Sequence, residues 1–174
     1  MRERFEQALS PEVHQAAWRY ALRLSTRRED AEDLLQESLI KAYSCFKQLR
    51  DASRFKGWFF SIVRSTHFDR LRRERARLPE TAELPQLAAR ETEPLARDIA
   101  EALARLPKPQ QELLGLFYID GLNLNETGQA LGIRPRAVRQ RLYRARQALR
   151  QQFDSIPAAK RALLPGGGNC HESL

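Results

Sequence analysis

The residues best suited to chemistry in this chain lie in one strongly basic segment. Seven arginines and no acidic residue lie between Arg134 and Arg150. Arginine can bind guanine with two hydrogen bonds, glutamine can bind adenine in the same way, and an α-helix fits the major groove of duplex DNA. Val138, Leu142 and Ala145 recur at helical spacing and leave the basic side exposed. The predicted DNA-binding residues are Arg136, Arg139, Gln140, Tyr143 and Arg144.

The residues that precede this segment predict how it is positioned. Asn123 is a good N-cap, and Glu126 three residues later completes a capping box. Gly132 suits the left-handed position that ends a helix, and Pro135 suits the first residue of the next one. The pattern therefore favours a helix-turn-helix that presents a basic helix to DNA. The alternative is a solvated arginine-rich helix that only improves solubility.

A second polar surface, on a predicted helix from about residue 26 to 46, is acidic. Thr26 and Glu29 predict its capping box, and its apolar residues face inward. The acidic first turn suits the positive end of the helix dipole, so dipole compensation plus a solvated face is one interpretation. Because the net charge is +8, this surface is also a candidate docking site for a partner protein. Its exposed side chains are expected to be Asp33, Gln36, Glu37 and Lys41.

The longest predicted helix, residues 55–77, combines an aromatic stripe with a basic end. The stripe includes Phe55, Trp58 and Phe59, and six arginines follow them. Aromatic platforms beside a positive track suit single-stranded nucleic acid, because every base has a face for stacking. Aromatic residues at helical spacing more often form a core, so packing is the favoured interpretation of Trp58 and Phe59.

Proline and glycine residues divide the chain into two helical modules. No alternating strand pattern is present, so we predict an all-α fold of two small modules joined by a flexible linker. The first module covers residues 5–77, and the second, a four-helix unit ending in the helix-turn-helix, covers 95–153. The linker, 78–94, contains three prolines and spans no more than roughly 55–60 Å when extended. Residues 154–174, with three consecutive glycines, are predicted to form a flexible tail.

Charge and composition narrow the classes of function. The net charge of +8 and the isoelectric point near 10.1 favour an anionic partner such as nucleic acid. No apolar run approaches the roughly 20 residues that span a bilayer, and the amino terminus lacks the apolar segment of a secretory signal. We therefore expect a soluble, cytoplasmic protein without membrane insertion.

The cysteines and histidines give no sign of a catalytic or metal centre. Cys45 and Cys170 do not suggest a disulfide framework. Cys170 and His171 supply only two candidate ligands, fewer than the four of a closed zinc site. His14 and His67 lie in separate contexts, with no phosphate-binding loop and no nucleophile-base pair nearby. We expect no enzymatic activity, no cofactor and no metal.

Two sets of motifs, in this order, resemble the second and fourth conserved regions of bacterial sigma factors. The first set is REDAEDLLQE at 28–37, Trp58 with Ile62, and DRLRR at 69–73. The second set is LP at 106–107, QE at 111–112, GL at 121–122, LGI at 131–133 and VRQRLYRAR at 138–146. With only these two regions and a short linker, the chain resembles the extracytoplasmic-function (ECF) class of sigma factors.

The resemblance implies a non-enzymatic initiation subunit that directs core RNA polymerase to promoter DNA. It implies binding to the clamp of the largest polymerase subunit and the flap of the second largest, and often an anti-sigma factor as a further partner. The implied polymerase contacts are Asp33, Gln36, Glu37 and Lys41. The implied contacts to the melted −10 element are Arg50, Asp51, Phe55, Arg64 and Ser65. The implied contacts to the −35 duplex are Arg136, Arg139, Gln140, Tyr143 and Arg144.

Three departures from the family pattern bear on these expectations. Ser65 stands where the family often has asparagine. Thr127 and Gly128 replace a large aliphatic residue and an alanine, and an interior glycine is expected to cost its helix on the order of 1 kcal/mol. Arg134 and Arg136 replace small or apolar residues, which is expected to favour phosphate contact over base readout.

The runner-up hypothesis is a free-standing helix-turn-helix regulator whose first module binds an effector or a partner. The acidic helix and its aromatic, basic successor distinguish the two hypotheses, because a simple repressor would need neither of them.

Overall fold

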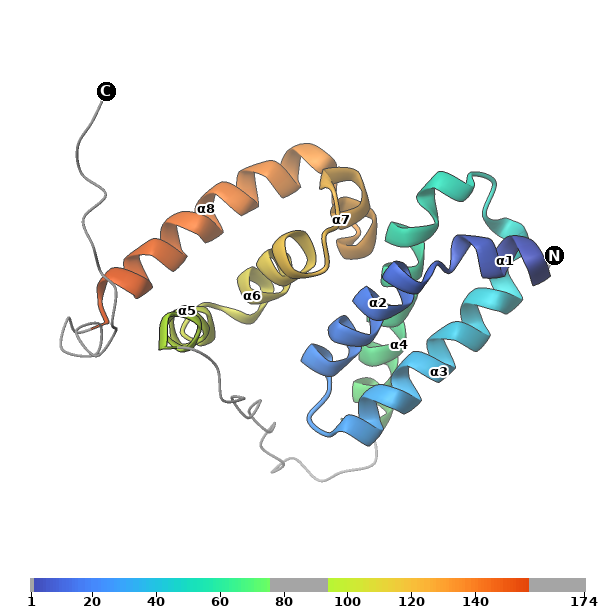
Figure 1. Cartoon of the computed structure of the whole chain (residues 1–174), viewed down its shortest axis with the longest axis horizontal. Coiled ribbons are helices and arrows are strands. Elements are labelled where there is room, and N and C mark those ends of the chain that lie inside the picture. The colour runs from blue at the N-terminus through green and yellow to red at the C-terminus, as the bar shows by residue number, and fades with distance from the viewer. Residues whose placement is uncertain (1, 76–93, 157–174) are drawn as a thin grey trace.

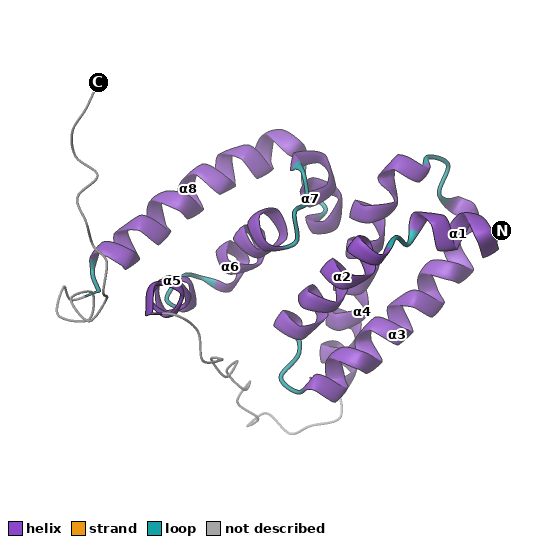
Figure 2. Cartoon of the chain, in the orientation of Figure 1, coloured by secondary structure: helices purple, strands orange, loops and turns teal. Residues whose placement is uncertain are grey.

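The computed structural model describes residues 2–75 and 94–156, and these ranges contain only helices and connecting loops (Figure 2). The prediction of an all-α fold is confirmed. Of the predicted linker only Pro94 is described, and Cys170 and His171 of the predicted tail lie outside the described residues. The boundaries of the two modules stay predictions. Among the described residues, no helix is both long enough and apolar enough to span a membrane.

The first module contains four helices (Figure 1). They are α1 (Arg2–Ala8), α2 (Pro11–Leu24), α3 (Arg28–Cys45) and α4 (Phe55–Arg75), with two short 3-10 turns between α3 and α4. The Oγ atom of Ser10 accepts a hydrogen bond from the amide of Val13 and caps α2. The predicted capping box of Thr26 and Glu29 is wrong. The N-cap of α3 is Arg27, one residue later than predicted, and no side chain caps this helix.

The second module contains the remaining helices. They are α5 (Pro94–Ala104), α6 (Lys108–Leu114), α7 (Leu124–Leu131) and α8 (Pro135–Asp154). A π-helical turn, η3 (Gly115–Ile119), continues α6. The chain then leaves this turn through Gly121, whose φ of +64° lies in the left-handed region that favours glycine.

The helix-turn-helix forms as the sequence predicts. The side chain of Asn123 accepts hydrogen bonds from the amides at 125 and 126, and the side chain of Glu126 accepts one from the amide of Asn123. Gly132 ends α7 at a φ of +68°, and Pro135 is the first residue of α8.

Gly128 corrects one expectation from the sequence. A Cβ atom at this position would lie 2.7 Å from the carbonyl oxygen of Ile133, which is closer than real Cβ contacts allow. The amide of Ile133 in turn donates a hydrogen bond to the carbonyl oxygen of Gly128, at 2.9 Å. The glycine therefore lets the turn fold tightly back onto α7, and in this fold it does not simply loosen the helix.

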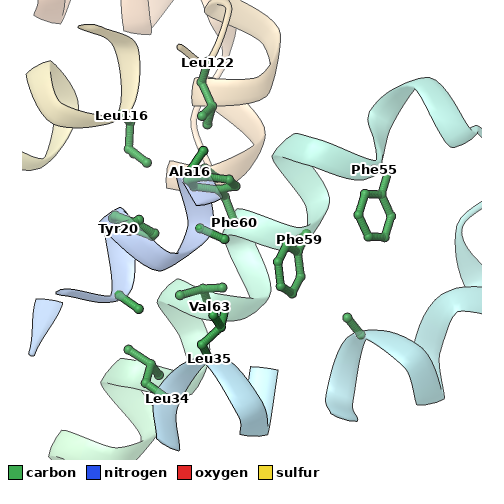
Figure 3. Close-up of a cluster of buried hydrophobic side chains, with 14 of the residues drawn as sticks. Ala16, Tyr20, Leu34, Leu35, Phe55, Phe59, Phe60, Val63, Leu116 and Leu122 are labelled. Atoms are coloured by element: carbon green, nitrogen blue, oxygen red, sulfur yellow. The ribbon is translucent and has the colours of Figure 1, made fainter. Parts of the chain in front are cut away.

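One hydrophobic core joins the two modules. Phe59 and Phe60 of α4 and Tyr20 of α2 are buried, which confirms packing as the role of Phe59. Trp58 is partly buried and packs against the same core. Leu116 and Leu122 of the second module belong to this core too, and Figure 3 shows them beside Tyr20 and Phe60. A smaller core under α8 contains Leu106, Leu113, Leu114, Val138, Leu142 and Ala145.

Candidate nucleic-acid interface

The basic face of α8 is exposed over the whole helix. The predicted −35 residues are all exposed, and Tyr143 is 58 % exposed. On the opposite side Val138, Leu142 and Ala145 are buried and fix the rotation of the helix about its axis. Within the described residues, Arg136, Arg139 and Arg144 have no carboxylate partner, so their guanidinium groups are available to an anion.

The start of α8 is well placed for a duplex. In a helix-turn-helix the first residues of the second helix contact base edges, while the first helix crosses the backbone. Here Pro135 begins α8, so Arg136, Arg139 and Gln140 occupy its first two turns. Their donors match the acceptors that guanine and adenine present in the major groove. The arrangement can bind duplex DNA and read bases.

The exposed surface of α3 is polar, and Glu37 lies at its centre. Its carboxylate pairs with Lys41 on α3, at 3.0 Å, and with Arg70 and Arg73 on α4, at 2.7 and 3.4 Å. Partial burial acts to raise the pKa of Glu37, but the hydrogen bonds from Lys41 and Arg70 outweigh it, and the pKa falls from 4.5 to about 2. Glu37 therefore stays ionised and holds α3 against α4.

The other predicted polymerase-binding residues surround this ion-pair cluster. Asp33 and Gln36 are exposed on α3, and Lys41 is partly exposed. A shallow groove runs between α3 and α4 beside them, lined by Glu37, Lys41, Asp69, Arg72 and Arg73. The surface thus carries both charges at close range, which suits a partner protein with a mixed polar surface.

The predicted −10 residues divide into two groups. Arg50, Asp51 and Ser65 are exposed. Asp51 caps the turn before α4, and the hydrogen bonds that it accepts from Ser53 lower its pKa. Phe55, by contrast, is only 2 % exposed and packs edge-on against Phe5. In this arrangement Phe55 contributes to the core and offers no face to a base.

Arg64 is engaged by the second module. Its Nε atom donates a hydrogen bond to Glu112 on α6, at 2.9 Å, and its guanidinium lies over the ring of Phe68. The hydroxyl of Tyr20 donates to the same Glu112 oxygen, at 2.6 Å. A second ionic contact joins Arg23 of α2 to Asp120, which follows η3. These contacts between the modules were not predicted from the sequence, because residues so far apart in the chain leave no local signal.

Among the described residues, no three histidine, cysteine, aspartate or glutamate side chains lie close enough together to hold a metal ion. Where charged side chains of different helices meet in this part of the chain, they form ion pairs, such as those of Glu37 with Arg70 and of Glu112 with Arg64.

Comparison with known proteins agrees with the geometry. Residues 10–77 match the family described as Sigma-70 region 2, and residues 96–149 match Sigma-70, region 4. The chain is 31 % identical over 157 residues to the ECF RNA polymerase sigma factor SigL of Mycobacterium tuberculosis, covering 86 % of this chain and 89 % of SigL. It is 31 % identical over 138 residues to the RNA polymerase sigma factor SigV of Bacillus subtilis, covering 78 % and 83 %.

Two further proteins are similar to this chain, one of them a longer relative and the other a solved structure with a similar fold. The chain is 33 % identical over 143 residues to the ECF RNA polymerase sigma factor SigE of Mycolicibacterium smegmatis, covering 76 % of this chain but only 55 % of SigE. The fold is similar to that of the sigma factor RpoE in its complex with the anti-sigma factor NepR from Bartonella quintana. That likeness has a TM-score of 0.65 and 24 % identity, over 88 % of this chain and 98 % of the other. The chain belongs to the ECF class of RNA polymerase sigma factors, the initiation subunits that direct the polymerase to promoters.

Proposed function

We propose that this sigma factor divides promoter binding between its two modules. The first module binds core RNA polymerase through Asp33, Gln36, Glu37 and Lys41. It contacts the melted −10 element through Arg50, Asp51, Arg64 and Ser65, and the buried Phe55 supports these residues from the core. The second module binds the −35 duplex through Arg136, Arg139, Gln140, Tyr143 and Arg144. Sigma factors are in general not enzymes, and we propose that this one acts in the cytoplasm as a binding subunit without catalytic activity.

The exposed arginines at the start of α8 carry this proposal. They belong to a capped helix-turn-helix, they have no carboxylate partner within the described residues, and the buried side of α8 holds them outward. A merely solvated helix would not need the tight turn that Gly128 and Gly132 provide.

We propose the same partners for this chain as for its family. The ion-paired surface of α3 supports a contact with the polymerase clamp, and the second module is proposed to bind the flap. RpoE of Bartonella quintana is bound to the anti-sigma factor NepR in the structure similar to this one, and we propose that an anti-sigma factor also binds this chain.

Transcription from a promoter library, with purified core RNA polymerase and this chain, tests the proposal. We expect transcripts from a narrow set of promoters that share −35 and −10 sequences. Arg139→Ala should relax the preference at one −35 position by roughly 5- to 150-fold, because a bidentate contact to a base is worth about 1–3 kcal/mol. Arg150→Ala, at the far end of α8, is the matched control and should leave the base preference unchanged.

Two results would contradict the proposal. Absence of polymerase binding, together with tight duplex binding by the chain alone, would favour a free-standing regulator. Equal losses on all templates for Arg139→Ala would assign Arg139 to a phosphate contact.

A further inference from the structure

The loop that carries two of the predicted −10 residues lies between two buried aromatic rings. Arg50 and Asp51 belong to this loop, which joins α3 to α4, and residues 50–54 are all exposed. Phe46, directly after α3, and Phe55, at the start of α4, are both buried. Their rings meet edge to face, with the centroids 5.9 Å apart. The placement of the exposed residues therefore depends on how firmly these two rings are held.

A third ring completes this contact from the amino-terminal helix. The helix α1 buries Phe5, whose ring stands edge-on to three others. Its centroid lies 5.2 Å from that of Phe46, 5.6 Å from that of Phe55 and 5.3 Å from that of Tyr43. Edge-to-face pairs are favourable beyond the burial alone, because the positive edge of one ring meets the negative face of the next. Phe5 thus contacts the rings at both ends of the loop and Tyr43 of α3 at the same time.

The exposed part of the loop is shaped by contacts within itself. Asp51 accepts hydrogen bonds from the amide and the hydroxyl of Ser53, at 2.9 and 2.7 Å, and pairs with Arg54 at 3.7 Å. These contacts fix the shape of the tip, but they do not attach it to the helices. Leu49 packs against the core and supplies one attachment. The aromatic contact at the two ends supplies the other.

The helix α1 precedes the residues that match the family. The match to Sigma-70 region 2 begins at residue 10, whereas α1 covers Arg2–Ala8. A helix of 7 residues is not stable alone in water, because so few hydrogen bonds do not offset the cost of nucleation. Figure 1 shows α1 beside the end of α3 and the start of α4. The packing of Phe5 therefore orders α1 and the two ends of the loop together.

We propose that α1 positions the loop for −10 recognition: Phe5 holds the rings of Phe46 and Phe55 together, and the loop between them thereby presents its exposed residues to the melted strand. A loop that is ordered in advance loses less conformational freedom when it binds, so more of each contact remains for discrimination between bases. Phe5 is a positioning residue, since it acts through the loop. This inference rests on the proposed function, which assigns Arg50 and Asp51 to the −10 element.

Transcription by core RNA polymerase and the full chain, from a promoter library varied at both elements, tests this inference. We expect Phe5→Ala to reduce the preference for the favoured −10 base by about tenfold, the size of one contact to a base, and to leave the −35 preference unchanged. Both preferences are ratios between templates in one reaction, so a smaller folded fraction does not change them. Phe5→Leu keeps an apolar side chain in the core and guards against misfolding of the alanine variant. It should relax the same preference to a smaller extent.

A matched control separates positioning from a loss of stability. Leu34 is buried in the same module and lies 12 residues before Phe46, roughly 18 Å along α3. Leu34→Ala should lower the stability of the fold and leave the −10 preference unchanged. Hydrogen–deuterium exchange of the free chain gives a direct view of the loop. The amides of Leu49 and Arg54, which donate to carbonyl oxygens within the loop, should exchange faster in Phe5→Ala than in Leu34→Ala.

Three results would overturn the inference. They are an unchanged −10 preference in both Phe5 variants, an equal loss of the −10 and −35 preferences, and an equal loss of the −10 preference in Leu34→Ala. Arg50→Ala tells this failure apart from failure of the proposed function. If Arg50→Ala changes the −10 preference and the Phe5 variants do not, the proposed function stands and the inference fails. If none of these variants changes it, the assignment of the loop to the −10 element fails as well.

Discussion

Glu37 shows how one side chain can serve two purposes. The resemblance to the family assigns it to the polymerase surface, and the structure places it between Lys41, Arg70 and Arg73. Its carboxylate thus neutralises part of a basic patch where α3 meets α4. A change at Glu37 alters the internal packing of the first module as well as any docking surface. Asp33, which is exposed on the same helix, is the cleaner probe of the docking surface alone.

The lowered pKa of Glu37 predicts how stability changes with pH. Its pKa falls from 4.5 in the unfolded chain to about 2 in the folded one, so the ionised form stabilises the fold. That contribution is fully present above pH 4.5 and is lost as the pH falls toward about 2. After allowance for solvent screening it amounts to roughly 1–3 kcal/mol.

The measurement is urea denaturation of the unmodified chain and of Glu37→Gln across this pH range. The two free energies of unfolding should differ above pH 4.5 and converge as the acid limit is approached. A difference that does not vary with pH would show that the ionisation of Glu37 contributes nothing.

At the scale of the element, the helix-turn-helix was predictable because its signals are local. The capping box, the left-handed Gly132 and the proline at the start of α8 each act within a few residues, and all three are present in the structure. The helix α1 was missed, because its 7 residues bury only Phe5 and show no extended periodicity. The prediction of a cap at Thr26 was wrong, because no side chain caps α3.

The substitution Gly128→Ala tests this element, because two arguments predict opposite signs for the change in stability. Helix propensity alone predicts that alanine stabilises α7 by about 1 kcal/mol. The carbonyl oxygen of Ile133 leaves only 2.7 Å for the new Cβ atom, so we expect alanine to destabilise the fold by about 1–3 kcal/mol. Thermal denaturation measures the change. A higher melting temperature would mean that the turn accommodates a methyl group, as the family pattern of alanine suggests.

At the scale of the whole molecule, the sequence predicted the modules but not their contact. Tyr20 and Glu112 are 92 residues apart in the chain, and Arg23 and Asp120 are 97 apart. No periodicity or cap connects residues at such distances, so Arg64 was assigned to DNA without its partner. Phe55 was likewise assigned to DNA on the resemblance alone, although its aromatic neighbours favour the core.

Gly57→Ala tests whether the modules unfold together. Both tryptophans, Trp18 and Trp58, lie in the first module, so tryptophan fluorescence reports that module while circular dichroism reports all helices. In the unmodified chain we expect the two signals to change at the same urea concentration, because the modules share one core. The new Cβ atom meets the backbone of α7, so in the variant the contact weakens by about 1–3 kcal/mol and the two transitions separate. Ser65→Ala, on the exposed side of the same helix, should keep them coincident. Coincident transitions in Gly57→Ala, with an unchanged or higher midpoint, would mean that α4 and α7 do not pack closely in solution.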